Sequence, residues 1–339
     1  MKPIPFPKFK RFDLTEHLDE FPPSGSKILV APLNWGLGHA ARCVPILNQL
    51  IQHGYEPIIA SDGFALEWLQ KQFPQLKSYT LPSYNITYAA HPFWFHWKLM
   101  TQLPHIWKTK REEHTFTKEI VENESIKLII SDNRFGVYHS NITSIFVTHQ
   151  IHIPKGIKGW LASKWHQNSI RKFDICWIPD VADTINLSGT LSHPIPKNIH
   201  HTYIGLLSSH VKEDLPIRFD LLILLSGPEP QRTIWERSLI KNFAQSNQKI
   251  ALVRGTNESN EISHFPESWE VYPFAYGKNL QDLLNASQKV IARTGYSTLM
   301  DLAVLEKEAL LTPTPNQPEQ EYLAHHIVHM KGWTISKQS

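Results

Sequence analysis

The chain has 339 residues, of which 41% are hydrophobic and 19% charged, and its formal net charge is +3. This length predicts two domains, and the small basic excess excludes a nucleic-acid-binding protein. The two cysteines exclude a disulfide framework or a cysteine-based metal cluster, and they predict a reducing compartment, the cytoplasm. We expect no secretory signal and no membrane span, because no run approaches the roughly 20 apolar residues that a span requires.

The first 26 residues are predicted to form an irregular, proline-rich N-terminal arm. Short apolar runs and amphipathic segments then alternate, which predicts a parallel sheet covered by helices on both faces. The expected strands are 27–33, 56–61, 127–132, 144–149, 174–179 and 203–207. The expected helices are 39–53, closed by Gly54, and a long one within 93–124. These elements define a predicted domain at residues 27–208.

The same alternation restarts after a polar segment, 208–216, which is typical of an interdomain linker. The expected strands lie within 218–230, 249–255, 270–274, 289–294 and 308–313. The expected helices are 231–246, 277–286, 296–306 and 318–330. The sequence therefore predicts a second α/β domain at residues 209–339.

A glycine-bearing turn links the first strand to the first helix in the sequence GLGHAAR, residues 36–42. Gly36 and Gly38 permit close backbone approach, and His39 stands at the helix start with Arg42 one turn further on the same side. Arg42 lies near the place of the third glycine of a dinucleotide-binding fingerprint, so the pattern does not favour NAD. The alternative for His39 is a capping or surface histidine.

Polar side chains follow two further strands of the N-terminal half. Asp132 ends the strand 127–132, Asn133 and Arg134 follow it, and His149 ends the next strand. Open α/β sheets bind their ligands at the carboxyl ends of strands, which makes these four residues candidates for the acceptor side of a site. Ordinary turn chemistry is the alternative for Asp132.

A second strand, glycine turn and helix occupies residues 289–306. Backbone N–H groups and a helix N-terminus at such a turn suit an anionic ligand. The candidate ligand-binding residues in and after this turn are Arg293, Thr294, Gly295, Ser297, Thr298 and Asp301. Asp301 is within reach of a ribose beside the helix, and Glu319 and Gln320, near the next helix start, can bind sugar hydroxyls. The alternative is helix capping.

Residues 84–111 interleave aromatic side chains with lysine and arginine. Such a mixture can lie at a membrane interface, but no face of the segment is cleanly apolar, which favours packing onto the sheet. Peripheral contact with the inner face of the cytoplasmic membrane is the alternative.

Taken together, GLGHAAR and ARTGYSTLMDLAVLEKEALLTPTPNQPEQEYLA (292–324) resemble the glycosyltransferase family 28 group, which contains the lipid II N-acetylglucosaminyltransferase. The resemblance implies a GT-B fold, in which two Rossmann-like domains face across a cleft. It implies that Asp301 binds the ribose and that Gln320 and Glu319 contact the donor sugar. It further implies donor-binding roles near the diphosphate and the base for Ser226, Gly227, Arg293, Thr294, Gly295, Ser297, Thr298, Phe274 and Ala275. Arg254 is an additional cation candidate.

The predicted activity is therefore an inverting transfer of a sugar from a nucleotide sugar, expected to be a UDP-sugar, to a hydroxyl acceptor. We expect His39 to be the base, with Asp132 as its orienting partner or its alternative. No metal or other cofactor is expected. The acceptor stays open between a lipid-linked or cell-envelope glycan and another hydroxyl compound. The alternative functions are a nucleotide-sugar 2-epimerase and a non-catalytic nucleotide-sugar-binding protein.

Overall fold

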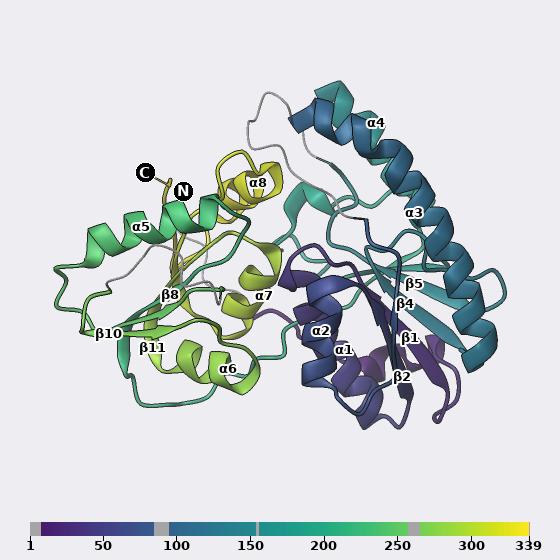
Figure 1. Ribbon diagram of the computed structural model, residues 1–339, viewed down its shortest axis with the longest axis horizontal. Coiled ribbons are helices and arrows are strands. Elements are labelled where there is room, and N and C mark those ends of the chain that lie inside the picture. Colours follow the sequence, from purple (N-terminus) through teal and green to yellow (C-terminus); the bar gives the residue numbers. More distant parts are fainter. Residues whose placement is uncertain (1–7, 85–94, 154–155, 257–264, 339) are drawn as a thin grey trace. The chain divides into compact units, whose positions relative to one another are not determined.

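The computed structural model describes residues 8–84, 95–153, 156–256 and 265–338, with the backbone alone for 95–103 and 156–162. The chain divides into two compact units, which are named here by their main segments. The N-terminal unit consists of Arg11–Ala182 and Thr190–Leu207. The C-terminal unit consists of Ser208–Ser339, Asp183–Gly189 and the segment up to Lys10. Each unit is an α/β structure with one parallel sheet (Figure 1), as the sequence predicts.

Seven parallel strands form the sheet of the N-terminal unit, in the order β3-β2-β1-β4-β5-β6-β7. Their central residues are apolar and buried, which is the pattern of a parallel sheet covered on both faces. The strands are β1 (Lys27–Pro32), β2 (Glu56–Ser61), β3 (Ser78–Thr80), β4 (Leu128–Asp132), β5 (Thr143–Val147), β6 (Ile175–Ile178) and β7 (His201–Tyr203).

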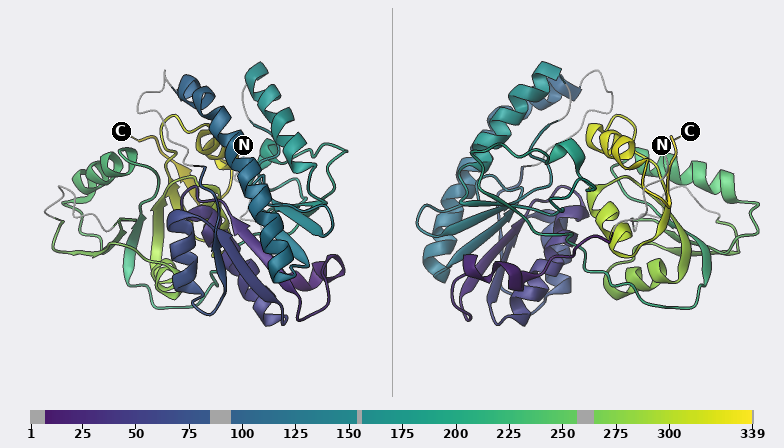
Figure 2. Two further views of the ribbon diagram at one scale, coloured as in Figure 1. Left: turned by 45° about the vertical axis from the view of Figure 1, so that its right-hand side comes forward. Right: turned by 180° about the vertical axis from the view of Figure 1, so that it is seen from behind.

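Helices cover both faces of this sheet. They are α1 (Leu37–Gln52), α2 (Gly63–Gln72), α3 (Phe95–Glu124) and α4 (Gly156–Ile170). α1 and α2 lie together on one side of the strands and α3 on the other (Figure 2). On the α3 side, Leu29, Ile58 and Ile129 of three neighbouring strands pack with Ile120 and Val121 of the helix. This core fixes the strand ends from which the polar side chains project.

The predicted N-terminal arm is described from residue 8 onward, and part of it is regular. Leu14–Glu20 forms a 3-10 helix, η1. The rings of Phe12 and His17 lie 5.6 and 5.4 Å from that of Trp177 in β6, and Trp177 Nε1 donates a hydrogen bond to Glu20 at 2.9 Å. Phe12 and His17 therefore join the core of the N-terminal unit, because their rings bury apolar surface against Trp177. The prolines of the segment do not prevent this packing.

Six parallel strands form the sheet of the C-terminal unit, in the order β10-β9-β8-β11-β12-β13. The strands are β8 (Phe219–Leu224), β9 (Ile250–Val253), β10 (Trp269–Tyr272), β11 (Ser287–Ala292), β12 (Glu308–Leu311) and β13 (Trp333–Ile335). The helices are α5 (Gln231–Phe243), α6 (Gly277–Asn285), α7 (Tyr296–Val304) and α8 (Pro318–Ile327). Trp235 and Leu239 anchor α5 on Leu221, Ile223 and Ile250 of the sheet.

Two boundaries differ from the sequence prediction. Asp183–Gly189, which the prediction places in the N-terminal domain, groups with the C-terminal unit. The polar segment 208–216 is not a free linker: Val211 N–H donates to Gln281 of α6, and Asn285 donates to the Val211 carbonyl, each at 2.9 Å. The polar composition of residues 208–216 predicted an exposed linker. The segment instead forms hydrogen bonds with the neighbouring helix α6.

Both sheets reverse their strand order next to their first strand. In the N-terminal unit the chain runs from β1 outward to β3 and then returns to β4, which pairs with β1. In the C-terminal unit it runs from β8 to β10 and returns to β11, which pairs with β8. Ligands of open α/β sheets bind outside the carboxyl ends of the strands at this switch point, because the loops there leave in opposite directions.

Candidate functional site

The switch point of the N-terminal unit brings His39 to Asp132. Pro32 at the end of β1 is in register with Asp132 at the end of β4. The turn after β1 uses Gly36 at φ +75°, a conformation that favours glycine, and α1 begins with the next residue. The histidine therefore lies in the first turn of α1, directly above the end of the neighbouring strand.

Four side chains form one hydrogen-bonded cluster at this point, which we name the base cluster: His39, Arg42, Asp132 and His149. His39 Nδ1 lies 2.8 Å from Asp132 Oδ1. Arg42 donates to both carboxylate oxygens of Asp132, and its NH1 group donates to His149 Nδ1 at 3.1 Å. Asp132 is fully buried, whereas 15% of the His39 side chain is exposed. The histidine is therefore the solvent-facing member of an otherwise buried cluster.

The charges of the cluster keep the carboxylate ionised and the His39 imidazole neutral. Burial alone would raise the pKa of Asp132, but the Arg42 charge, with hydrogen bonds from Arg42 and His39, outweighs it and holds that pKa well below its usual range. Burial and the Arg42 charge lower the pKa of His39, against a smaller opposing effect of Asp132. A neutral imidazole can accept a proton near neutral pH.

The hydrogen bonds also decide which nitrogen of His39 can act. An ionised carboxylate only accepts, so the 2.8 Å contact requires that Nδ1 carries the hydrogen and donates to Asp132. The Arg42 NH2 group lies 2.9 Å from Nδ1. Because Nδ1 carries the hydrogen, it has no free lone pair with which to accept a hydrogen bond from Arg42. The lone pair of the neutral ring is left on Nε2, which is the arrangement of a general base with an orienting carboxylate.

Two of the predicted acceptor-side residues have other roles than a ligand contact. Arg134 is fully buried and donates to Asp62 and Glu113 at 2.6 Å each, so it ties the end of β4 to α2 and α3. Asn133 adopts φ +58° and its amide lies 3.4 Å from Asp132. Strand-end position predicted Arg134 as a ligand contact, but buried carboxylates already neutralise it.

Sequence reasoning missed two residues beside the base cluster. Asn34, in the turn after β1, donates to Asp62 at 3.2 Å, and its side-chain oxygen accepts from Ala65 N–H at 3.3 Å. These contacts join the turn that carries Gly36 and Gly38 to the start of α2. Asp62 directly follows the buried strand β2, and Asp132 ends the buried strand β4, so a similar strand-end signal could have found Asp62.

The switch point of the C-terminal unit gathers most of the predicted donor-side residues. Leu224 of β8 is in register with Ala292 of β11. Ser226 and Gly227 follow β8, and Arg293, Thr294 and Gly295 follow β11. Gly295 precedes α7 without a side-chain cap, and half-buried Ser297 and Thr298 lie in the first turn of this helix. A positive helix end and two hydroxyls thus lie at the predicted diphosphate position.

Gln320, in the first turn of α8, is held next to the same edge. Its side-chain oxygen accepts from Thr314 N–H at 2.8 Å, and its carbonyl accepts from Thr294 Oγ1 at 2.9 Å. Its side-chain NH2 group makes no hydrogen bond to the described residues and can donate to a ligand. Glu319 precedes it in the helix, and half-buried Phe274 and Ala275 lie between β10 and α6.

The two predicted donor-side arginines are internal. Arg254 donates to fully buried Glu236 at 2.5 and 3.2 Å. The Arg293 guanidinium lies 3.9 Å from the centre of the Trp235 ring and donates to backbone carbonyls, including that of Pro313 at 3.1 Å. Burial lowers the pKa of Arg293 to about 10. Arg254 is bound to the buried carboxylate of Glu236, and Arg293 is bound to backbone carbonyls. Both arginines therefore have structural partners at the strand ends where a ligand contact was predicted.

Asp301 of α7 has two partners from the segment that the sequence analysis treats as a linker. Ser208 donates to Asp301 Oδ1 at 2.6 Å, and His210 Nε2 lies 3.9 Å from Oδ2. The Asp301 side chain is 25% exposed. Burial raises the pKa of Asp301, and His210 and Ser208 oppose this effect.

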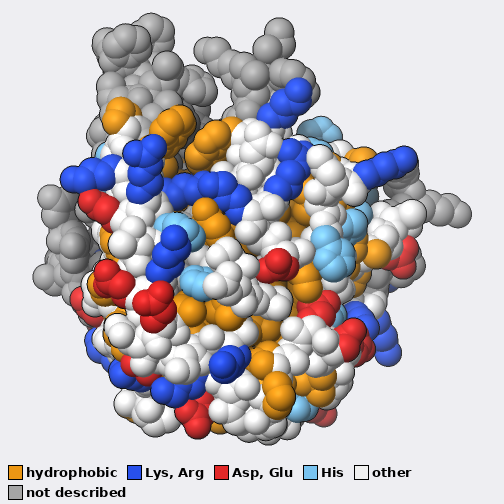
Figure 3. Space-filling model, turned by 90° about the vertical axis from the view of Figure 1, so that its right-hand side faces the viewer, with side chains coloured by type: hydrophobic (Ala, Val, Ile, Leu, Met, Phe, Trp, Pro, Cys, Tyr) orange, Lys and Arg blue, Asp and Glu red, His pale blue; other side chains and the backbone are white. Residues whose placement is uncertain are grey.

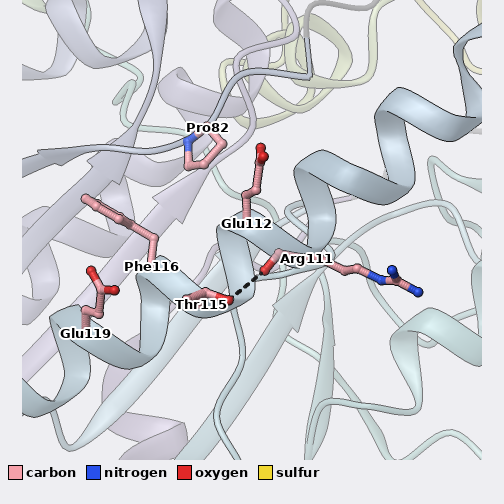
Figure 4. A pocket seen from close by; sticks show the side chains of 6 residues that line it. All are labelled: Pro82, Arg111, Glu112, Thr115, Phe116 and Glu119. Carbon is pink, nitrogen blue, oxygen red and sulfur yellow. Dashed lines mark hydrogen bonds between the residues drawn. The ribbon is translucent and has the colours of Figure 1, made fainter.

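A separate open hollow lies along α3 in the N-terminal unit (Figure 4). Its lining residues are Pro82, Arg111, Glu112, Thr115, Phe116 and Glu119. None of them belongs to the base cluster or to the predicted donor-side set. The described residues contain no helix long and apolar enough to cross a membrane.

Comparison with known proteins places the chain in an enzyme class. Residues 230–339 match the glycosyltransferase family 28 C-terminal domain. It is 21% identical over 295 residues to the uncharacterised glycosyltransferase MK0977 of Methanopyrus kandleri, and the match covers 83% of each chain. The predictions of a glycosyltransferase and of a GT-B fold are confirmed.

Solved glycosyltransferases share the fold of this chain. The glycotransferase of kitacinnamycin superposes with a TM-score of 0.60 at 12% identity, over 93% of this chain and 87% of that one. MurG of Acinetobacter baumannii superposes with a TM-score of 0.53 at 11% identity, over 92% and 86%. At these identities the likeness concerns the architecture, so the chemistry has to be argued from the residues of this chain.

Proposed function

We propose that the protein is an inverting glycosyltransferase that moves a sugar from a nucleotide sugar, a UDP-sugar in the first instance, to a hydroxyl acceptor. The contact of 2.8 Å between His39 Nδ1 and Asp132 Oδ1 carries the proposal. It leaves Nε2 of a neutral imidazole as proton acceptor at the switch point of the N-terminal unit, while the C-terminal unit carries the family 28 domain.

The reaction is a single displacement at the anomeric carbon. The acceptor hydroxyl gives its proton to His39 Nε2, and its oxygen bonds to the anomeric carbon. The bond from that carbon to the diphosphate oxygen breaks, and its electron pair leaves on the diphosphate. Attack opposite the leaving group inverts the configuration. Asp132 stabilises the imidazolium that forms, since it is ionised and accepts from Nδ1.

The departing diphosphate is stabilised by backbone and hydroxyl groups of the C-terminal unit. The start of α7 supplies its helix dipole and the side chains of Ser297 and Thr298. The Gln320 amide binds sugar hydroxyls. We include metal independence in the proposal, because the helix dipole and the hydroxyl groups can stabilise the diphosphate without a metal ion.

Replacing His39 by Ala tests the base. We expect nucleotide affinity to be retained and turnover to fall about 10²-fold or more, because the proton acceptor is lost. Calorimetric titration with UDP, GDP and TDP in the presence of a chelator measures binding, and product release from the matching sugar conjugates measures turnover. His53→Ala, at the far end of α1, is the matched control. Wild-type turnover should decline only as pH falls below the ordinary histidine range, since the pKa of His39 is lowered.

Other outcomes of this experiment point elsewhere. Normal turnover of His39→Ala would move the base to another residue. Consumption of donor without any acceptor would favour a 2-epimerase, and binding without turnover would favour a nucleotide-sugar-binding protein. Folded wild-type protein that binds no nucleotide would contradict the proposal as a whole.

A lipid-linked acceptor and peripheral contact with an anionic membrane form a further part of the proposal. Much of the aromatic-basic segment 84–111 lies outside the described side chains. In the described part of this segment, Trp107 is 55% exposed. Separately, Lys and Arg side chains form a band across the face of the molecule shown in Figure 3. Sedimentation with vesicles containing anionic lipid should fall in Trp107→Ala; unchanged sedimentation would remove this support.

A further inference from the structure

Two exposed aromatic residues, Trp35 and Phe64, lie on the two segments that Asn34 joins beside the base cluster. Trp35 follows Asn34 in the turn after β1, and Phe64 lies in the first turn of α2. Each of the two is 47% exposed. Single exposed aromatic residues are common on protein surfaces, but two of them beside a proton acceptor define a candidate binding surface. We name them the aromatic pair.

The contacts of Asn34 hold the two segments against each other. Its side-chain NH2 group donates to Asp62 at 3.2 Å, and its side-chain oxygen accepts from Ala65 N–H at 3.3 Å. Trp35 is the next residue after Asn34. Phe64 lies between the two residues that Asn34 binds. The aromatic pair therefore belongs to two pieces of backbone that are fixed relative to each other.

The proton acceptor lies at the end of the same turn. His39 is four residues after Trp35, and Gly36, at φ +75°, turns the chain between them. His39 and Phe64 lie in the first turns of α1 and α2, two helices that lie side by side (Figure 1). A compound whose hydroxyl reaches His39 Nε2 is therefore close enough to contact the aromatic pair.

The segments that carry the aromatic pair have no positive side chain. Residues 33–39 and 62–65 contain neither lysine nor arginine. Arg42 of the base cluster is 2% exposed and is bound to Asp132. A phosphate on the acceptor beside its hydroxyl would find no cationic side chain in these two segments to pair with it. The charge distribution favours a neutral acceptor group.

We propose that Trp35 and Phe64 determine the acceptor specificity by stacking on the acceptor, and that the acceptor hydroxyl is borne by a neutral aromatic ring, as in a phenol. This inference rests on the proposed function, because it names the acceptor class for the same site. Aromatic rings that pack on one another gain more than the burial of their area provides. An apolar chain elsewhere on the acceptor is compatible with this group.

The strength of the base supports this acceptor class. Burial and the Arg42 charge lower the pKa of His39, so its neutral ring holds a proton weakly. A phenolic hydroxyl has a pKa of about 10, whereas an aliphatic hydroxyl is about as weakly acidic as water, whose pKa is about 15.7. Transfer of a proton to a weak base is less unfavourable from the stronger acid. The phenolic proton passes to Nε2 as the phenolic oxygen bonds to the anomeric carbon and the diphosphate leaves with the electron pair.

The experiment compares two neutral compounds with the same carbon skeleton, 2-naphthol and its saturated counterpart decahydro-2-naphthol. Equilibrium dialysis in the presence of UDP measures their dissociation constants. For the wild type we expect 2-naphthol to bind about tenfold more tightly, because two ring contacts are lost in the saturated compound. Trp35→Ala and Phe64→Ala should each reduce this ratio severalfold. The affinity for UDP should not change, because the residues that match the family 28 domain lie in the C-terminal unit.

Matched variants separate stacking from other effects. Trp35→Phe and Phe64→Tyr keep an aromatic ring and should keep most of the preference. Trp107→Ala makes the same kind of change at a 55% exposed residue of α3 and should behave as the wild type.

Three results would overturn the inference alone. They are wild-type protein that binds UDP but prefers the saturated alcohol, alanine variants that keep the wild-type ratio, and tighter binding of 2-naphthyl phosphate than of 2-naphthol. Wild-type protein that binds no nucleotide contradicts the proposed function instead.

Discussion

Arg254 and Glu236 illustrate how a buried partner changes what a charged residue does. Glu236 has no exposed side-chain surface and is bound by Arg254 and, at 3.3 Å, by Arg232. Removing one member of such a cluster leaves a charge in a medium that solvates it poorly. The arginine therefore stabilises the start of the C-terminal unit, although its position after β9 is where a phosphate contact would be expected.

We predict that Arg254→Met lowers the free energy of unfolding by about 3 kcal/mol, at the low end for a broken buried pair because Arg232 remains. The double variant Arg254→Met with Glu236→Leu should recover part of that loss. Chemical denaturation measures the free energy of unfolding of both variants. Arg237→Met is the control, because Arg237 is exposed on α5, the helix that carries Glu236. Wild-type stability combined with lost nucleotide affinity would instead support the diphosphate contact suggested by the sequence.

The base cluster shows what residue patterns can reveal on their own. His39 and Asp132 were found because one lies at the start of the helix after a buried strand and the other at the carboxyl end of a buried strand. Parallel strands bring these positions to one edge of the sheet. The hydrogen bond between Ser208 and Asp301 could not be found in this way. It depends on the path of an irregular segment that only tertiary contacts define, and no local periodicity records that path.

Among the elements, the longest and most regular were predictable. Strands such as β1 and helices such as α1 are apolar and clearly bounded. The missed helix α4 contains two glycines and no clean apolar stripe, and α2 has only ten residues. The missed strands β3 and β13 are three residues long and lie at sheet edges, where tertiary pairing decides the conformation.

The contact between segment 183–189 and α8 is the element-scale feature that sequence did not indicate. His326 Nε2 donates to the Asn186 carbonyl at 2.9 Å. Gly189, at φ +52°, packs so closely that an added Cβ would lie 2.3 Å from the Tyr322 hydroxyl and 2.8 Å from His326 Nδ1. A side chain can be placed there only if the side chains of Tyr322 and His326 or the segment itself shift.

We predict that Gly189→Ala lowers the free energy of unfolding by about 1–3 kcal/mol, from backbone strain and the clash with Tyr322. Adding Tyr322→Phe should restore part of the loss, because it removes the nearest atom. Thermal unfolding compares the single and double variants. Gly332→Ala is a useful reference, since its φ is +88° but its nearest neighbour would be 3.6 Å away. Equal effects of the two glycine substitutions would show that the clash contributes nothing.

At the scale of the whole molecule, the chain passes between its two units four times, after Lys10, Ala182, Gly189 and Leu207. The C-terminal unit is thus assembled from separate stretches of sequence. The helix α8 carries Glu319 and Gln320. Its His326 donates a hydrogen bond to the carbonyl of Asn186, which lies more than a hundred residues earlier in the sequence.

This interleaving limits how such an enzyme can be recombined. An exchange of everything after Ser208 between two related enzymes would give α8 a partner segment that did not evolve with it. The exchangeable module is the C-terminal stretch together with residues 183–189 and the segment up to Lys10, and substitutions at positions 186 and 189 should accompany any transplanted α8.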